Sequence, residues 1–231
     1  MGIRDRVLRV REGIAESCAR AGRSEGEVTL VAVSKTRSPQ EINEAVAAGV
    51  PDIGENYVQE LLAKTADIDG AARLHFIGHL QSNKARQLVG AVSLIQSVDR
   101  LSLAREIDRQ AARKNLVQRV LLEVNVAGEH SKAGICPGAA MELAHQMAEL
   151  KNLKLCGLMA IPPAAEEPSD TTPYFEQLCQ LFLDMQAKKL DNTDISVLSM
   201  GMSGDYREAI ACGATMVRVG TAIFGPRPPR T

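Results

Sequence analysis

The sequence has few aromatic residues and no tryptophan. Of its 231 residues, three are Tyr and four are Phe, which is too few for a surface that stacks unpaired bases. The charges nearly cancel, since 27 Lys and Arg stand against 28 Asp and Glu and give a net charge of -1. A balanced charge provides no general attraction to nucleic acid or to anionic membranes. We therefore expect a protein that binds neither.

Paired cysteines and long hydrophobic runs are also absent. The five cysteines are odd in number and form no C-x-x-C pair, so neither a disulfide framework nor a metal site is predicted. No stretch of roughly 18 apolar residues occurs, and the charged first residues lack the apolar segment of a signal peptide. These features are typical of a soluble, cytoplasmic protein.

The sequence does contain a regular alternation of strand-like and helix-like segments. An amphipathic helix with apolar residues from Ile3 to Cys18 comes first, and short apolar segments that predict strands follow. The eight predicted strands are residues 28–33, 52–54, 74–77, 94–97, 120–125, 153–160, 195–199 and 215–219. Helical patterns separate them, and the clearest helix start is Ser38, which together with Glu41 forms a capping box.

Eight strands alternating with helices predict an α/β fold, a single (β/α)8 TIM barrel with an extra N-terminal helix. The length is close to the typical value of about 250 residues, so residues 1–231 form one domain without a second. An open doubly wound sheet is the alternative, because strand order cannot be read from periodicity. Residues 162–173 are expected to form an exposed loop or a lid, and residues 226–231 an extended tail.

Lys35 directly follows the first predicted strand. In a parallel barrel the carboxyl ends of the strands meet at one mouth, where active sites are built. A lysine there can attack carbonyl groups when its surroundings lower its pKa. The position alone also fits a solvated lysine, so other residues must support a chemical role.

Two further segments follow the last two predicted strands, residues 199–204 and 218–225. Both contain small residues, hydroxyls and backbone amides, a combination typical of a phosphate site at a barrel mouth. Ser203 could instead cap the next helix, and Gly220 could serve a turn. Arg218 interrupts an apolar strand and therefore needs an acceptor, either a neighbouring carboxylate or a cofactor.

Polar residues also lie after the second predicted strand, in segment 54–60, and across the third, in segment 75–84. Asn56 is expected at the same mouth, although it could simply cap a helix. His75 and His79 favour hydrogen-bonded structural roles, because no third residue at suitable spacing completes a metal site.

Together these segments and residues 157–162 make the chain resemble the family of pyridoxal phosphate homeostasis proteins, over almost its whole length. The resemblance implies a barrel like the first domain of alanine racemase, and pyridoxal 5'-phosphate (PLP) held as a Schiff base on Lys35. By the same resemblance Arg218 faces the pyridine nitrogen and Asn56 lines the ring. The residues expected around the phosphate are Ser199, Ser203, Gly220 and Thr221. His79 receives no role.

The resemblance favours a carrier or regulator of PLP over an enzyme with strong turnover. Racemisation by two bases needs a second acid or base, which in the racemase comes from a domain that this chain lacks. An arginine at the pyridine nitrogen also disfavours protonation of the ring, which weakens the ring as an electron sink for carbanion reactions. No catalytic residue is assigned, and the expected partners are PLP, related B6 vitamers and PLP-dependent apoenzymes, with the protein a monomer.

Three alternatives stay open. A class I aldolase would also use a strand-end lysine, a weak PLP-dependent amino-acid racemase would exchange the Cα proton of amino acids, and a pure interaction module would not need Lys35. The roles of Lys84 and Lys132 are left unassigned.

Overall fold

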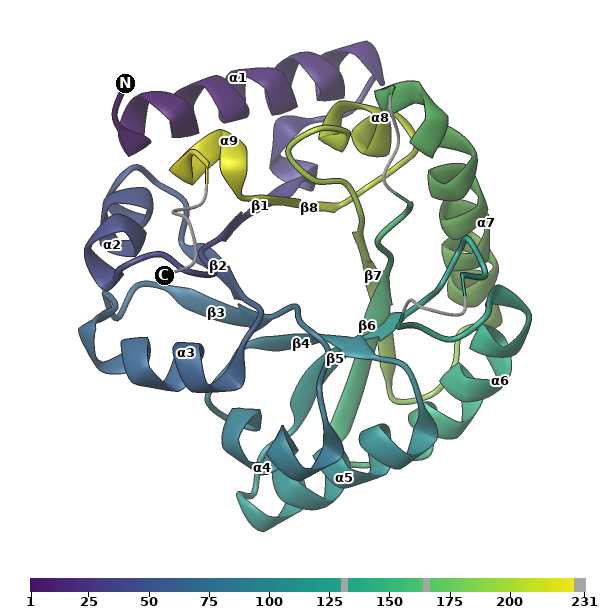
Figure 1. Ribbon diagram of the computed structural model, residues 1–231. Coiled ribbons are helices and arrows are strands. Elements are labelled where there is room, and N and C mark those ends of the chain that lie inside the picture. The colour runs from purple at the N-terminus through teal and green to yellow at the C-terminus, as the bar shows by residue number, and fades with distance from the viewer. Residues whose placement is uncertain (130–132, 164–166, 227–231) are drawn as a thin grey trace.

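A computed structural model describes residues 1–129, 133–163 and 167–226. Eight parallel strands close into a barrel in which each strand pairs with its neighbours in sequence, and β1 pairs with β8 (Figure 1). The barrel prediction is confirmed, and the alternative of an open sheet is wrong. The strands are β1 Thr29–Val33, β2 Asp52–Glu55, β3 Arg73–Phe76, β4 Leu94–Val98, β5 Gln118–Glu123, β6 Leu153–Met159, β7 Thr193–Ser199 and β8 Met216–Val219. Both ends of each predicted strand lie within two residues of the ends of one of these strands.

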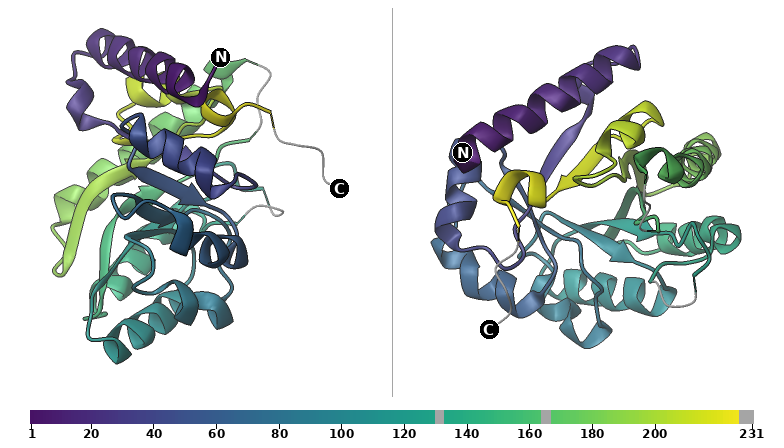
Figure 2. Two further views of the ribbon diagram at one scale, coloured as in Figure 1. Left: turned by 90° about the vertical axis from the view of Figure 1, so that its left-hand side faces the viewer. Right: turned by 45° about the horizontal axis from the view of Figure 1, so that its top comes forward.

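Helices surround the barrel, and the long α1 lies across its outside, packed on α8 and α9 (Figure 2). The helices are α1 Ile3–Arg20, α2 Pro39–Ala47, α3 Val58–Lys64, α4 Ala85–Leu88, α5 Leu101–Arg113, α6 Pro137–Ala148, α7 Thr172–Lys188, α8 Tyr206–Ala211 and α9 Thr221–Phe224. Short 3-10 helices are η1 Glu25–Glu27, η2 Thr65–Asp67, η3 Ser82–Lys84 and η4 Pro168–Thr171. None of the helices in the described part of the chain is long and apolar enough to span a membrane.

Local sequence explains where two of these helices begin. Ser38 Oγ accepts from the Glu41 amide, and the Glu41 carboxylate accepts from the Ser38 amide, so the predicted capping box starts α2. The expected loop 162–173 is shorter than predicted, because Pro173 lies in the first turn of α7, a position that tolerates proline. Residues 164–166 of that loop lie outside the described residues, as do residues 227–231 of the expected tail.

Apolar side chains form two separate clusters. The larger one fills the layer between strands and helices, and it includes the predicted apolar face of α1 and one face of α7. The smaller one consists of strand residues alone, which places it inside the barrel: Val31, Leu94, Leu121, Cys156, Met159 and Met216. Side chains alternate along a strand, so Glu123, Arg218 and Gln96 share the inward face with Leu121, Met216 and Leu94.

Candidate functional site

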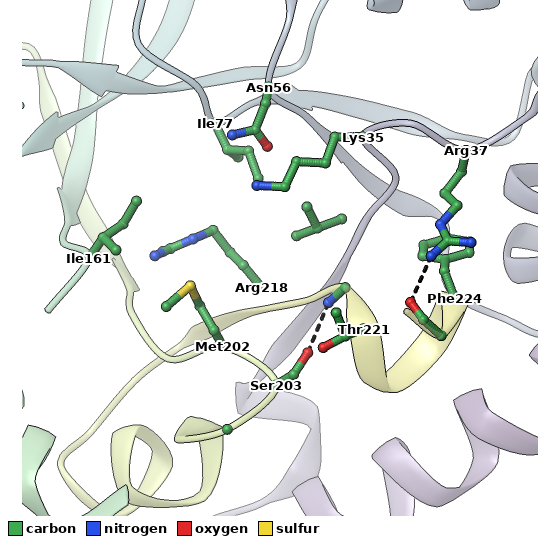
Figure 3. Close-up of a pocket in the computed structure, with 14 residues that line it drawn as sticks. Lys35, Arg37, Asn56, Ile77, Ile161, Met202, Ser203, Arg218, Thr221 and Phe224 are labelled. Carbon is green, nitrogen blue, oxygen red and sulfur yellow. Dashed lines mark hydrogen bonds between the residues drawn. The ribbon is translucent and has the colours of Figure 1, made fainter. Parts of the chain in front are cut away.

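A pocket opens at the carboxyl end of the barrel, with about 810 Å³ of empty space, part of it open to solvent. Its walls come from the ends of six strands and the start of α9. The lining residues are Val33, Lys35, Arg37, Asn56, Ile77, Ile161, Met202, Ser203, Gly204, Arg218, Gly220, Thr221, Phe224 and Gly225 (Figure 3). Six of the seven residues predicted from the sequence therefore lie in one pocket, and Ser199 does not.

Lys35 extends along one wall of the pocket, with Asn56 on one side of its side chain and Arg218 on the other (Figure 3). It follows β1 by two residues, and the next residue, Thr36, has a left-handed backbone with φ of 66°. The Thr36 amide donates to Glu60 Oε1 at 2.5 Å. That bond holds the loop in a conformation that threonine rarely adopts.

A buried charge cluster beneath this loop fixes the start of Lys35. Lys64 Nζ donates to the Ser34 carbonyl at 3.2 Å, to Glu55 Oε1 at 3.0 Å and to Glu60 Oε1 at 2.5 Å. Ser34 Oγ donates to the same Glu55 oxygen at 2.6 Å. Burial raises the pKa of Glu55, although Ser34 and Lys64 oppose that shift. The cluster ties β1, β2 and α3 together at the point where the lysine emerges.

Arg218 forms the floor of the pocket and is only 3% exposed. Its Nη1 donates to Ser199 Oγ at 2.6 Å and its Nη2 to the Ala160 carbonyl at 2.8 Å. Burial lowers the pKa of the guanidinium to about 10, and the nearby carboxylates of Glu123 and Asp205 oppose the shift. Arg218 therefore stays charged at neutral pH, and it remains accessible from the pocket.

Ser199 lies one layer deeper than predicted. It pairs in register with Met216, two residues before Arg218 on the neighbouring strand, and it is fully buried. Its hydroxyl donates to Gln96 Oε1 at 2.7 Å while it accepts from Arg218. Ser199 thus contacts the arginine of the pocket from below.

The opposite wall is formed by Ser203, Gly204 and the start of α9. Ser203 Oγ accepts from the amides of Gly220 and Ala222, at 3.2 and 3.3 Å, so it caps α9 and not α8, the helix that follows it. The backbone amides of Ser203, Gly204 and Thr221 find no acceptor among the described residues. Three free N–H groups beside a hydroxyl form a cradle suited to an anion.

Asn56 follows β2 and lines the pocket instead of capping α3, whose N-cap is Tyr57. Its Oδ1 is buried and has no hydrogen-bond partner within the described part of the chain. The backbone of Asn56 packs closely against Gly78, because a Cβ added to Gly78 would lie 2.1 Å from the Asn56 carbonyl oxygen. An unsatisfied buried acceptor is costly unless a ligand supplies a donor.

The sequence analysis assigned no individual role to the rest of the lining. Arg37 Nη2 donates to the carbonyls of Gly225 and Pro226, each at 2.7 Å, and its guanidinium lies 5.9 Å from the centre of the Phe224 ring. Its place two residues after Lys35 was the available signal. Ile77, Ile161 and Met202 supply apolar walls. They lie in segments that the sequence analysis singled out, but it gave these three residues no role.

The remaining polar residues of the sequence analysis lie elsewhere. His75 is buried and hydrogen-bonded to Asp52 and Gln96, which confirms its structural role. No group of three metal-ligating side chains occurs within residues 1–129, 133–163 and 167–226. His79 is exposed, Lys84 ends η3 away from the lining, and Lys132 lies outside the described residues.

Comparison with known proteins identifies the family. The family model for the N-terminal domain of alanine racemase matches residues 14–228. A pyridoxal phosphate homeostasis protein of Aquifex aeolicus is 46% identical over 226 residues, which cover 96% of this chain and 97% of that protein. The chain belongs to the pyridoxal phosphate homeostasis protein family. The resemblance seen in the sequence is thereby confirmed.

Solved structures agree with membership of the pyridoxal phosphate homeostasis protein family. PipY of Synechococcus elongatus, solved with PLP bound, is 36% identical with a TM-score of 0.79, over 92% of this chain and 100% of that one. Without PLP, PipY gives a TM-score of 0.86. Alanine racemase of Streptomyces coelicolor is 23% identical with a TM-score of 0.72, over 98% of this chain and 58% of that one. That last likeness concerns the fold alone.

Proposed function

We propose that this protein binds PLP as a Schiff base on Lys35 and takes part in intracellular PLP homeostasis without strong catalytic turnover. The observation that carries the proposal is the pocket itself, in which a lysine, an anion cradle and a buried arginine face one space. Homology supports it, because the relatives are named for PLP homeostasis and PipY has been solved with PLP.

The residues present fit this cofactor. The amides of Ser203, Gly204 and Thr221, which lack acceptors in the described structure, would hold the phosphate. Asn56 lines the pocket where the ring would lie, and its buried Oδ1 has no hydrogen-bond partner among the described residues. Ser199 would act through Arg218, since it does not line the pocket, and Gly220 would shape the cradle.

Lys35 would capture the cofactor reversibly. When bound, PLP supplies an aldehyde that condenses with the lysine amine, forming a C=N bond and releasing one water. The apolar side chains of Ile77, Ile161 and Met202 form part of the lining and reduce its contact with water. The reverse reaction with water returns the free aldehyde, as a carrier requires.

The pocket is poorly equipped for racemisation. Among the described residues that line it there is no Asp, Glu, His, Cys or Tyr, so Lys35 has no second acid or base opposite it. Arg218 is a hydrogen-bond donor only and would leave the pyridine nitrogen unprotonated, which weakens carbanion stabilisation. Both observations support a holder of PLP over a racemase.

We further propose that the protein acts as a cytoplasmic monomer, binds related B6 vitamers, and passes PLP to PLP-dependent apoenzymes. Its free cysteines fit a reducing compartment. Analytical ultracentrifugation tests the monomer, and activation of an added apoenzyme by the loaded protein, compared with free PLP, tests the transfer.

The decisive experiment is to load the purified protein with PLP, record its visible spectrum, reduce it with borohydride and map the labelled peptide. We expect an absorption band that borohydride removes and a label on Lys35. Lys35→Ala should abolish both, whereas Lys84→Ala, a lysine outside the lining, should change neither. A label on another lysine, or rapid exchange of the Cα proton of added amino acids, would contradict the proposal.

A further inference from the structure

A chain of hydrogen-bonded side chains connects the pocket floor to the other end of the barrel. Arg218 Nη1 lies 2.6 Å from Ser199 Oγ, which lies 2.7 Å from Gln96 Oε1. Gln96 Nε2 lies 3.0 Å from His75 Nδ1, and His75 Nε2 lies 3.1 Å from Asp52 Oδ1. All five residues are buried, with exposed fractions between 0% and 5%.

This chain crosses the barrel interior. Gln96 belongs to β4 and Ser199 to β7, which are not neighbours in the closed sheet, so their hydrogen bond must span the space between the strands. Asp52 is the first residue of β2, at the end of the barrel opposite to the pocket. There Arg73 binds its carboxylate through Nε at 2.8 Å and Nη2 at 2.5 Å.

The bonds all run in one direction. Arg218 has only N–H donors, so Ser199 must accept from it and donate its own proton to the carbonyl oxygen of Gln96. The Gln96 amide then donates to His75 Nδ1, which must carry no proton. His75 Nε2 therefore carries the proton and donates to Asp52. The chain runs from a cation to an anion through a neutral imidazole.

Turning the Gln96 amide over gives a poorer arrangement. Its NH2 group would then point at Ser199, whose hydroxyl would receive donors from two sides and lose its acceptor among the described residues. The Gln96 carbonyl oxygen would also face Met216 Sδ, which now accepts from Gln96 Nε2 at 3.2 Å. A buried proton without an acceptor is costly, so the direction of the chain is fixed.

We propose that Gln96 and His75 are positioning residues for Arg218, which they act on through Ser199 so that the guanidinium is held toward the cofactor ring. Two of the Arg218 donors are already used below the pocket, by Ser199 and by the Ala160 carbonyl. The planar guanidinium can turn only by breaking them. The proposal deepens the proposed function and rests on it.

The charges at the two ends agree with this direction. Although burial alone would raise the pKa of Asp52, hydrogen bonds from His75 and Arg73 hold the pKa below its ordinary value. The carboxylate therefore remains an acceptor at neutral pH, and Arg218 remains a donor. Each bond in such a chain polarises the next one.

The first test needs no cofactor. Protein labelled with ¹⁵N in its histidines should show, at neutral pH, an unprotonated Nδ1 and a protonated Nε2 for His75, assigned with a His75→Gln variant. Gln96→Glu places a carboxylate where the amide donated, so both ring nitrogens of His75 should become protonated. A protonated Nδ1 in the wild-type protein overturns the proposal.

The second test uses the PLP-loaded protein. Gln96→Leu should shift the absorption band of the bound cofactor and weaken PLP binding roughly tenfold, the factor that corresponds to about 1.4 kcal/mol. The matched control is Gln118→Leu, another buried glutamine, which bonds Gly90 and Val92 at the start of β5. This variant should lose stability but keep the band and the affinity.

The outcomes separate the two proposals. An unchanged band and affinity in Gln96→Leu overturn the positioning role, as does an equal change in Gln118→Leu. A wild-type protein that binds no PLP refutes the proposed function instead, and the spectrum of His75 then still decides whether the directed chain exists.

Discussion

Glu123 is predicted to destabilise the folded protein at neutral and alkaline pH. It ends β5 on the inward face, is only 7% exposed, and its Oε2 has no hydrogen-bond partner in the described structure. Burial, and then the nearby charge of Asp99, raise its pKa from 4.5 to about 7, although Arg218 opposes the shift. Folding therefore favours the neutral carboxyl group.

The loss of stability can be estimated from the difference between the folded and unfolded pKa values of Glu123. One pKa unit corresponds to about 1.4 kcal/mol, so a rise from 4.5 to about 7 makes the ionised form cost about 3 kcal/mol in the folded state. The raised pKa means that the folded state binds more protons than the unfolded state between these values. The stability of the folded protein is therefore greatest below the pKa that Glu123 has in the unfolded state, and it falls as the pH rises through the pKa of Glu123 in the folded state.

Glu123→Gln removes this ionisation and keeps the shape of the side chain. We expect it to raise the free energy of unfolding by less than about 1 kcal/mol near pH 5 and by about 3 kcal/mol near pH 8. Urea unfolding of the cofactor-free protein at both pH values measures the gain. Glu12→Gln, a change of an exposed carboxylate on α1, should stay within about 0.5 kcal/mol at both.

A gain that does not depend on pH would refute the reasoning, because it would come from packing and not from ionisation. A loss of stability near pH 8 would show that the attraction between Glu123 and Arg218 outweighs the burial of the carboxylate.

Three further changes test the residues that line the pocket or support its lining. Lys64→Met leaves Glu55 buried without its cation, and urea unfolding should show a loss of about 3 kcal/mol that shrinks at acidic pH, where Glu55 is protonated. Ser203→Ala removes the acceptor that organises the anion cradle, and equilibrium dialysis should show PLP affinity reduced about tenfold. Gly78→Ala forces a Cβ against the Asn56 carbonyl, and thermal unfolding should show a destabilisation of about 3 kcal/mol, with weaker PLP binding.

Much of the fold could be predicted because its signals are local. A strand of the barrel is a short apolar segment, and a helix start such as that of α2 is written in Ser38, Pro39 and Glu41. Residues that follow strands gather at the mouth of any parallel barrel. For this reason Lys35 and Asn56 could be expected at one mouth, and the family resemblance added Arg218 to the same site.

The depth of each residue could not be predicted, because it depends on how neighbouring strands are staggered. Ser199 ends β7, yet its partner in register is Met216, so it lies below the pocket and not in its wall. Gln96 meets Ser199 only because the barrel closes. The partners of Arg37, the carbonyls of Gly225 and Pro226, come from the far end of the sequence. Periodicity reports which face a side chain is on, but not which distant strand it meets.

The pocket lies at the seam where the first and last strands join, so both ends of the sequence must be in place before it exists. Lys35 comes from the beginning of the chain, and the anion cradle and Arg218 come from its end. An incomplete polypeptide still emerging from the ribosome would carry the reactive amine without the cradle. If Lys35 binds PLP as proposed, only molecules with a closed barrel would hold the cofactor in this pocket, and colour development during refolding would report the last step of assembly.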